Sequence, residues 1–287
     1  MNGQKRKAEL DGVAETTLWT LHHRALAAKH PRSALRDPKA IEVIDAVDYP
    51  FEGRFGTGNW GYAQGMAVRA RCYDREVRRF LRDHPDGMVV SLGEGLETQF
   101  WRVDNGQVRW LGVDLPEVAA LRRRLLPDEP RHRTLPCSAT DTRWMDEVDA
   151  SRGLLILAQG MLMYLPREVV HRLIEDCAAR FPGAELVFDT PPAWMAARTE
   201  RGRWKYPAGY RPPPMLWGMT PAEQRTLRAV HPNVTAVRAV REPRGRGFLC
   251  GWVLPLANVL PAFRARKPLW VTRVSFGPTQ HHQGVSR

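Results

Sequence analysis

The stretch VVSLGEGLETQFWR, residues 89–102, decides the fold class. An apolar run ends in Gly93-Glu94-Gly95, and a polar segment compatible with a helix follows at once. Strand, glycine turn and helix in this order are how α/β proteins hold a nucleotide-like ligand. A dinucleotide turn would have a third glycine where this chain has Thr98, and the pattern G-x-x-x-x-G-K-[ST] of P-loop proteins is absent. The turn therefore favours a ligand of another kind.

An acidic residue closes the second apolar run of this region, VRWLGVD, at Asp114. At that position of an open parallel sheet, a carboxylate can accept hydrogen bonds from both hydroxyls of a ribose. The ligand is thus expected to carry an adenosine-like ribose and need not carry phosphates. S-adenosylmethionine meets that description, and the alternative is a glycine turn beside an exposed aspartate that binds nothing.

Short apolar runs alternate with segments of helical period along most of the chain. The runs cover residues 88–92, 108–113, 133–136, 154–158, 184–189, 234–240 and 247–254. Alternation of strand and helix predicts a parallel sheet covered on both faces. The last two runs have no clear helix between them and are expected to form an antiparallel hairpin at the sheet edge. We therefore expect an α/β fold with a seven-stranded, mainly parallel, doubly wound (Rossmann-like) sheet.

Three regions are predicted around this sheet. Residues 1–86 form an N-terminal helical cap, in which a helical pattern is broken at Pro31 and Pro38 and an apolar stripe follows over 66–81. Residues 87–275 form the ligand-binding domain, with an insertion at 191–219 after the fifth strand. Residues 276–287 are expected to be a flexible tail.

Composition narrows the function classes. The chain has 287 residues, 43% of them hydrophobic, and a formal net charge of +12. Its arginines are spread along the whole sequence, which favours ordinary solvated side chains over a nucleic-acid interface; attraction for an acidic small substrate is the other alternative. No apolar run approaches the ~20 residues that cross a bilayer, and no signal-peptide core is present. Four scattered cysteines without a C-x-x-C pair indicate reduced thiols, a cytoplasmic location and no metal site.

Three long motifs in order resemble those of the leucine carboxyl methyltransferase family, and in particular its tetracenomycin-type polyketide O-methyltransferase branch. They are LGEGLET with Arg102, VDLPEV at 113–118 and QGMLMYL at 159–165. The resemblance runs from about Thr17 to Leu254. It implies a class I fold that binds S-adenosylmethionine and releases S-adenosylhomocysteine, without a metal, in secondary metabolism such as antibiotic biosynthesis.

The resemblance also implies roles for individual residues. Arg69, with Arg71 as the second choice, is expected to pair with the carboxylate of the cofactor, and Arg24 is a basic residue near the acceptor. The other expected cofactor contacts lie at the ends of the predicted strands: Gly93, Gly95, Asp114, Leu115, Ser138, Ala139, Asp141 and Gln159. Two residues depart from the family pattern, because Glu97 stands where Asp is usual and Gln159 where Glu is usual. The second change removes a negative charge near the cationic cofactor and is expected to weaken its binding.

Tyr164, after the fourth strand, is the candidate catalytic residue, because its phenol could donate a hydrogen bond to the acceptor oxygen. A carboxylate, with a pKa near ~4, needs no general base, whereas a phenol near ~10 would benefit from one. No His-Asp pair accompanies the cofactor motifs, so methylation of a carboxylate is favoured, on a polyketide-like aromatic acid or a modified peptide C-terminus. Methylation of a hydroxyl and cofactor binding without catalysis are the alternatives.

The insertion is rich in Trp, Tyr, Pro and Arg, and these residues suit a lid over a flat, apolar acceptor. Its candidate acceptor contacts are Trp194, Tyr210 and Trp217. The same composition would suit the contact of a homodimer. A nucleic-acid methyltransferase is disfavoured, because the fourth strand ends in AQGMLMYL rather than in an Asn/Asp-Pro-Pro-Tyr/Phe-like motif.

Overall fold

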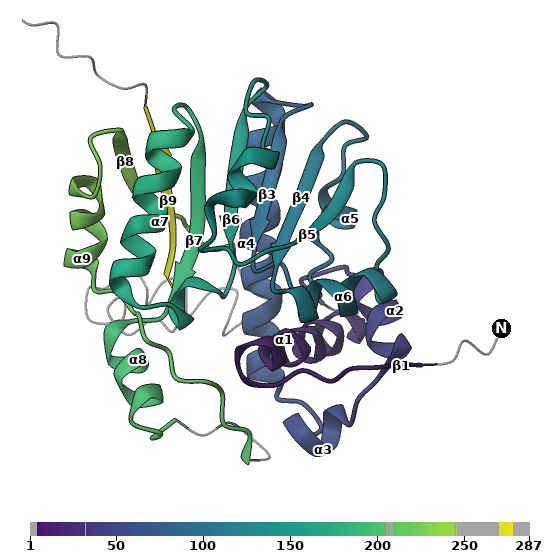
Figure 1. Ribbon diagram of the computed structural model, residues 1–287. Coiled ribbons are helices and arrows are strands. Elements are labelled where there is room, and N and C mark those ends of the chain that lie inside the picture. The colour runs from purple at the N-terminus through teal and green to yellow at the C-terminus, as the bar shows by residue number, and fades with distance from the viewer. Residues whose placement is uncertain are drawn as a thin grey trace, which may run out of the picture.

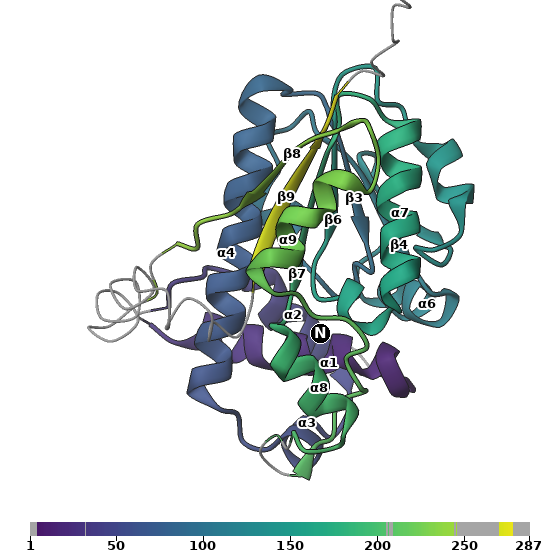
Figure 2. The ribbon, with the colours of Figure 1, turned by 90° about the vertical axis from the view of Figure 1, so that its left-hand side faces the viewer.

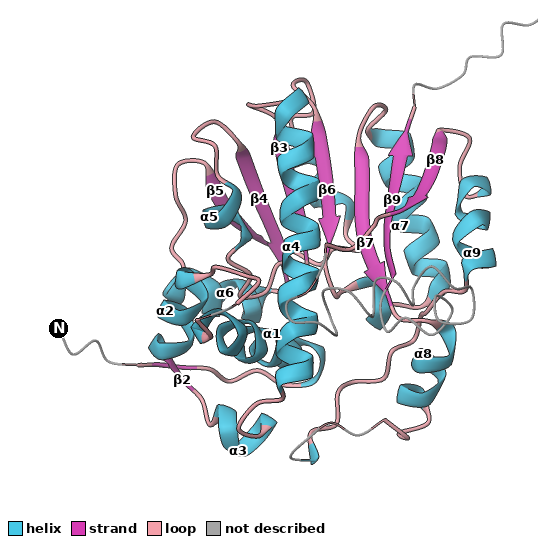
Figure 3. Cartoon of the chain, turned by 180° about the vertical axis from the view of Figure 1, so that it is seen from behind, coloured by secondary structure: helices cyan, strands magenta, loops and turns pink. Residues whose placement is uncertain are grey.

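A seven-stranded sheet forms the centre of the computed structural model, which describes residues 5–31, 33–204, 206, 209–243, 245 and 270–277 (Figure 1). The strand order is β5-β4-β3-β6-β7-β9-β8, and only β9 runs antiparallel to its neighbours (Figure 3). The strands of this sheet are β3 (Met88–Leu92), β4 (Arg109–Asp114), β5 (His132–Pro136), β6 (Leu154–Ala158), β7 (Glu185–Thr190), β8 (Val234–Ala239) and β9 (Trp270–Phe276).

Helices precede the sheet and connect its strands. The α-helices are α1 (Gly12–Lys29), α2 (Pro38–Ala46), α3 (Phe51–Phe55), α4 (Trp60–Asp83), α5 (Gln99–Val103), α6 (Pro116–Leu125), α7 (Arg167–Arg180), α8 (Ala193–Glu200) and α9 (Pro221–Thr226). Short 3₁₀ helices occur at η1 (Thr142–Glu147), η2 (Leu162–Tyr164) and η4 (Leu227–Ala229), and β1 (Arg6–Lys7) pairs in parallel with β2 (Val47–Asp48). Among the described residues, no helix is long and apolar enough to cross a membrane.

The predicted fold class is confirmed, and six predicted strands agree with β3 to β8 within one residue at each end. The expected position of the seventh strand differs. Residues 247–254 lie outside the described residues, and the seventh strand of the sheet is β9 at 270–276, which reaches into the stretch expected to be a tail. The expected antiparallel pairing at this end of the sheet is present, but β9 lies between β7 and β8 and pairs with both.

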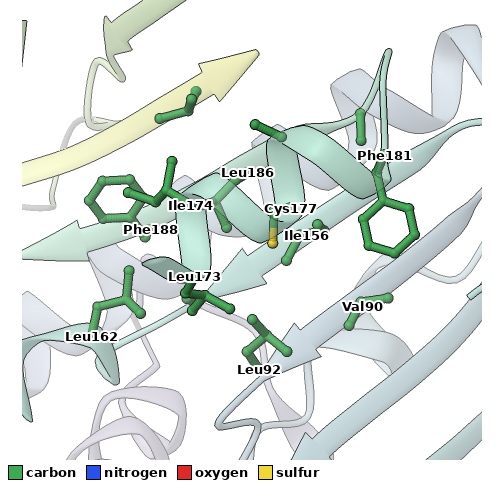
Figure 4. Packing of buried hydrophobic residues seen from close by; sticks show 14 of the residues in the cluster. Val90, Leu92, Ile156, Leu162, Leu173, Ile174, Cys177, Phe181, Leu186 and Phe188 are labelled. Atoms are coloured by element: carbon green, nitrogen blue, oxygen red, sulfur yellow. The ribbon is translucent and has the colours of Figure 1, made fainter. Parts of the chain in front are cut away.

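Alternating side chains on the strands build a core on each face of the sheet. Val90 and Ile156 pack with α7 on one face, whereas Val89 and Leu155 pack with α4 on the other. Figure 2 shows α4 and α7 on opposite sides of the strands, and Figure 4 shows how Phe181, Leu186 and Phe188 join the α7 side. Because both faces are buried, the central strands β3 and β6 are apolar except for Ser91, as is usual in parallel sheets.

The N-terminal helices lie at the edge of the sheet where the parallel strands end (Figure 1). Their own core includes Leu18 and Leu21 of α1, Val43 of α2 and Phe55 of α3, all buried. Asp37 begins α2 by accepting a hydrogen bond from the backbone N–H of Ala40 at 3.1 Å. The cap therefore places α1 directly over the carboxyl ends of the strands, where α/β proteins bind ligands.

Candidate functional site

A pocket of about 260 Å³ opens at the carboxyl ends of the central strands. One wall comes from the start of α1, and the floor comes from the turns that follow β3, β4, β5 and β6. Arg69 reaches the pocket from α4. The structure thus brings together the glycine turn, Asp114, Gln159 and Tyr164, which are far apart in the sequence.

The glycine turn requires its two glycines. Gly93 has φ of 63° and Gly95 has φ of 56°, a left-handed conformation that disfavours side chains. A Cβ on Gly93 would lie 2.6 Å from Cγ of Met161, and one on Gly95 would overlap the hydroxyl of Thr17. Protein atoms therefore already exclude a side chain here, and the expected contact with the methionine moiety of a cofactor remains a prediction.

A buried arginine holds this turn in shape. Nη1 of Arg122, on α6, donates to the carbonyl oxygens of Gly95 at 2.7 Å and Glu97 at 2.8 Å. The guanidinium is fully buried, and its Nε lies 3.1 Å from the carboxylate of Glu94. That carboxylate also accepts a hydrogen bond from Nε1 of Trp110 at 2.7 Å. The charge of Arg122 is therefore compensated without solvent, and the glycine turn is tied to the helix that follows Asp114.

Asp114 is 9% exposed and lines the pocket. Its carboxylate accepts hydrogen bonds from the backbone N–H groups of Gly95 at 2.6 Å and Leu115 at 2.8 Å. Burial nevertheless raises the pKa of Asp114 to about 6. A carboxylate can accept about four hydrogen bonds, so lone pairs remain for ligand hydroxyls. Leu115 also lines the pocket and keeps 36% of its surface exposed, which offers an apolar face to a base.

The loop after β5 supplies Ser138, Ala139 and Thr140 to the pocket. Asp141 stands apart from them, because it is not among the residues that line the pocket. Its carboxylate accepts a hydrogen bond from the backbone N–H of Arg143 at 3.0 Å and from Nε of the same residue at 2.8 Å. Asp141 thereby caps η1, and its expected contact with adenine remains a prediction.

Two buried polar atoms without partners mark the other end of the pocket. Among the described residues, Nε of Arg69 and Oε1 of Gln159 have no hydrogen-bond partner, although both side chains line the cavity. Buried polar groups are normally paired, and unpaired ones commonly mark a ligand position. Nε of Arg69 is a donor on a cation and fits the carboxylate of an amino acid. Oε1 of Gln159 is a neutral acceptor and fits the ammonium group. The residues therefore fit S-adenosylmethionine, and the expected contact of Asp114 with its ribose remains a prediction.

Glu97 is the centre of a buried network of ion pairs. It lies 2.7 Å from Nη1 of Arg24 and 2.8 Å from Nη1 of Arg102, and both arginines also contact Asp37. Burial alone would raise the pKa of Glu97, but the two guanidinium groups hold it at about 2. Nε2 of Gln159 donates to Glu97 at 3.3 Å. The two departures from the family pattern are therefore neighbours in space.

Arg24 lines the pocket, yet its N–H groups donate hydrogen bonds to other protein groups. Nε donates to Asp37 at 3.1 Å, Nη1 to Glu97 and Nη2 to the carbonyl oxygen of Leu96 at 2.7 Å. Its side chain is 4% exposed. This geometry gives Arg24 a structural role, and a contact with the acceptor remains a prediction.

Tyr164 also lines the pocket, on the side of α1. Burial raises the pKa of its phenol to about 12, so the hydroxyl keeps its proton. The facing residues of α1 were not predicted from the sequence: Val13, Ala14, Thr16, Thr17 and Thr20. Their signal was the spacing of three and four residues that places them on one helix face with Arg24.

The aromatic residues expected to form a lid lie elsewhere. Trp217 is 4% exposed and packs in the sheet core, with its ring centroid 5.8 Å from that of Phe188. Tyr210 is 2% exposed and packs on Phe55 of the cap at 4.8 Å. Trp194 lies on α8 and is 44% exposed. None of the three lines the pocket, and their contact with an acceptor remains a prediction.

Metal ligands are a separate question. Within the described part of the chain, no group of three or more His, Cys, Asp or Glu residues is placed to hold a metal ion. Cys72, Cys137 and Cys177 are buried free thiols.

Comparisons with known proteins identify the family of this chain. A family model described as leucine carboxyl methyltransferase matches residues 17–178, more than half of the chain. The tetracenomycin polyketide synthesis O-methyltransferase TcmP of Streptomyces glaucescens is 35% identical over 186 residues, which cover 64% of this chain and 68% of that protein. An S-adenosyl-L-methionine-dependent methyltransferase of Gibberella zeae is 27% identical over 205 residues, covering 65% and 69% of the two chains.

Among solved structures, an O-methyltransferase family protein from Burkholderia thailandensis aligns with a TM-score of 0.47 and 14% identity, over 93% of this chain and 73% of that one. The family assignment rests on the matches in sequence. The chain therefore belongs to the leucine carboxyl methyltransferase family, and it is an S-adenosylmethionine-dependent methyltransferase.

Proposed function

We propose that this enzyme methylates a carboxylate oxygen of a small acid and releases a methyl ester and S-adenosylhomocysteine. The acid–base content of the pocket carries the proposal. The described residues that line it include no His, Lys or Cys. Their titratable side chains are two arginines, three carboxylates and one tyrosine: Arg24, Arg69, Glu94, Glu97, Asp114 and Tyr164.

None of these groups is suited to take a proton from a phenol at neutral pH. Two of the carboxylates have a lowered pKa, because Arg122 pairs with Glu94 and two arginines pair with Glu97. Asp114 is engaged by two backbone N–H groups, and we assign its remaining lone pairs to the ribose. An acceptor that is already ionised avoids the need for a base, and a carboxylate is such an acceptor.

The residues of the pocket would act by binding and orientation. Bound S-adenosylmethionine supplies an electrophilic methyl group on a sulfonium, and in-line transfer then depends on alignment of the acceptor oxygen. The Tyr164 hydroxyl is protonated and can donate a hydrogen bond that aligns this oxygen. The start of α1 closes the same side of the pocket with apolar and hydroxyl groups and limits the access of water.

The relatives suggest the kind of acid. One of them is named for tetracenomycin polyketide synthesis, and the family model is named for leucine carboxyl groups. We infer that the acceptor is a polyketide-like aromatic acid, and a peptide with a free C-terminal carboxylate is the second candidate. We also infer that catalysis needs no metal.

The alkali stability of the product tests the proposal. The enzyme is incubated with methyl-labelled S-adenosylmethionine and three acceptors: an aromatic hydroxy acid, its carboxamide with the phenol retained, and a short peptide ending in leucine. A methyl ester releases volatile labelled methanol in mild alkali, whereas a phenyl methyl ether does not. We expect alkali-labile label from the aromatic acid and none from its carboxamide.

The other results separate the alternatives. Alkali-stable label on both the acid and the carboxamide would identify a phenol methyltransferase. Alkali-labile label on the peptide and on neither of the other acceptors would identify peptide C-termini as the acceptor class. Enzyme that binds S-adenosylhomocysteine but methylates none of the three would contradict the acceptor class, and methylation that appears only with added divalent metal would contradict the independence of metal.

A further inference from the structure

Asp189 is a buried carboxylate directly behind the pocket. It lies near the end of β7, has no exposed surface and is not among the pocket-lining residues. Two residues that do line the pocket, Gly160 and Arg69, lie between Asp189 and the cavity and contact it. A buried charge in this position affects the pocket through its neighbours rather than by touching a ligand.

One oxygen of Asp189 is fully used by the protein. Oδ1 accepts a hydrogen bond from the hydroxyl of Tyr73 at 2.6 Å and another from the backbone N–H of Gly160 at 2.8 Å. Gly160 has φ of 69°, and a Cβ on it would lie 2.7 Å from Nη1 of Arg69. Asp189 thus fixes the turn at Gly160, and the absence of a side chain on this glycine makes room for the guanidinium of Arg69.

The other oxygen faces Arg69 without bonding to it. Oδ2 lies 3.7 Å from Nη1, beyond hydrogen-bond distance, and has no hydrogen-bond partner among the described residues. Nε of Arg69 is equally unpartnered there. A buried arginine beside a carboxylate usually forms a bidentate pair. Here Tyr73 and Gly160 hold Oδ1 on the far side, so the pair stays incomplete.

An incomplete pair has two consequences for the pocket. The charge of Asp189 compensates the buried guanidinium, so Arg69 can remain in the cavity before a ligand arrives. Because no oxygen of Asp189 captures its N–H groups, Arg69 keeps donors for an anionic ligand group. Burial raises the pKa of Asp189, and the Arg69 charge together with the two donors on Oδ1 opposes that rise.

We propose that Asp189 is a positioning residue that holds Arg69 ready for the carboxylate of the cofactor's amino-acid moiety. The inference rests on the proposed binding of S-adenosylmethionine at this pocket. It goes further in naming a residue outside the cavity that sets the affinity for one part of the ligand. The nucleoside part, bound near Asp114, should be independent of Asp189.

The test compares two ligands that differ in the amino-acid moiety. S-adenosylhomocysteine has the carboxylate, whereas 5′-methylthioadenosine has the same nucleoside without it. Asp189→Asn keeps an oxygen for Tyr73 and Gly160 and removes the charge that faces Arg69. We expect calorimetry to show about tenfold weaker binding of S-adenosylhomocysteine, comparable to the loss of one charge-assisted hydrogen bond, and unchanged binding of 5′-methylthioadenosine.

Matched variants exclude a general effect on the strand end. Thr190→Val changes the next buried residue of β7, whose hydroxyl has no hydrogen-bond partner among the described residues, and should alter neither affinity. Arg69→Gln should weaken only S-adenosylhomocysteine, and adding Asp189→Asn to it should cause no further loss. Should Asp189→Asn not fold, Tyr73→Phe replaces it: Oδ1 then keeps only the Gly160 donor, so the carboxylate can turn toward Arg69, and binding of the same ligand should weaken.

The outcomes are distinct. Equal loss of both ligands in Asp189→Asn, or no loss of either, would overturn the positioning role while leaving the cofactor site intact. Additive losses in the double variant would do the same, because Asp189 would then act independently of Arg69. Wild-type protein that binds neither ligand would instead overturn the proposed function itself.

Discussion

Cofactor binding should be coupled to a proton at Asp114. In the cofactor-free protein, burial raises the pKa of this carboxylate to about 6, although two backbone N–H groups favour its anion. Ribose hydroxyls that donate to the carboxylate would add to the donors on the anion and lower its pKa. The bound state should therefore prefer the ionised form, and below pH 6 the free site must lose a proton before it binds.

The size of the effect follows from the pKa. With a value of about 6, roughly nine in ten free sites carry the proton at pH 5, so the apparent affinity should fall about tenfold between pH 7 and pH 5. The rise from 3.8 to about 6 also corresponds to about 3 kcal/mol of destabilisation of the cofactor-free protein at pH 7. Because the folded-state pKa lies above the unfolded value, the cofactor-free protein is more stable by this amount below about pH 4, and it loses this stability as the pH rises past about 6.

Calorimetry of S-adenosylhomocysteine binding measures the coupling. Titrations at pH 5 in two buffers with different ionisation enthalpies should report the release of about one proton, and titrations at pH 7.5 almost none. The ligand's own carboxyl and amino groups, near about 3.5 and 8, contribute little at pH 5.

Asp114→Asn should bind about 1–3 kcal/mol more weakly at pH 7 and lose the proton release. Without cofactor, the same variant should be as stable as the wild type or more stable, because the removed charge outweighs one lost backbone acceptor. Affinity that is independent of pH from 5 to 7 in the wild type, or a cofactor-free variant that unfolds more easily, would refute the reasoning.

Two further variants test the acceptor side and the ion network. With the cofactor at saturating concentration, Tyr164→Phe should lower kcat/KM for the acceptor only two- to tenfold, about one neutral hydrogen bond, and the pH profile should stay flat from about 6 to 9. A loss of ~10²-fold with a rate that rises with pH would indicate a phenol acceptor. Gln159→Glu would place a second carboxylate about 3.3 Å from Glu97 and should destabilise the fold by roughly 2–4 kcal/mol in denaturant titrations, with recovery when Glu97→Gln is added. Unchanged stability of the single variant would mean that the two side chains separate.

The sequence predicted the sheet well because buried parallel strands are short continuous apolar runs. Residues 88–92 and 154–158 match β3 and β6 at both ends. The difference concerns the last strand, whose predicted stretch lies outside the described residues. The stretch 247–254 is apolar and resembles a buried strand, whereas 270–276 alternates less obviously, with Arg273 in its middle. Tertiary pairing explains that arginine, because it lies 2.8 Å from Glu76 of α4, a contact that no local pattern reveals.

Site residues that follow a strand were predictable from the strand pattern, whereas in the cap only Arg24 and Arg69 were expected, and those only from the family resemblance. The carboxyl ends of parallel strands meet at one edge, which is why Gly93, Asp114, Ser138 and Gln159 could be grouped without coordinates. The face of α1 depends on how the cap docks on the sheet. Its threonines read as an ordinary polar helix face in the sequence.

Charge balance in the pocket was the other feature that the sequence could not give. From the sequence alone, Gln159 in place of the usual Glu means one negative charge fewer beside a cationic cofactor. In the structure its amide donates to Glu97, whose own charge is held by Arg24 and Arg102. A carboxylate at position 159 would compete with Glu97 for those guanidinium groups, whereas the amide leaves them undisturbed and keeps Oε1 directed to no protein partner among the described residues. The amide of Gln159 and the carboxylate of Glu97 thus belong to one network beneath the glycine turn, in which a neutral side chain at position 159 leaves the ion pairs of Glu97 intact.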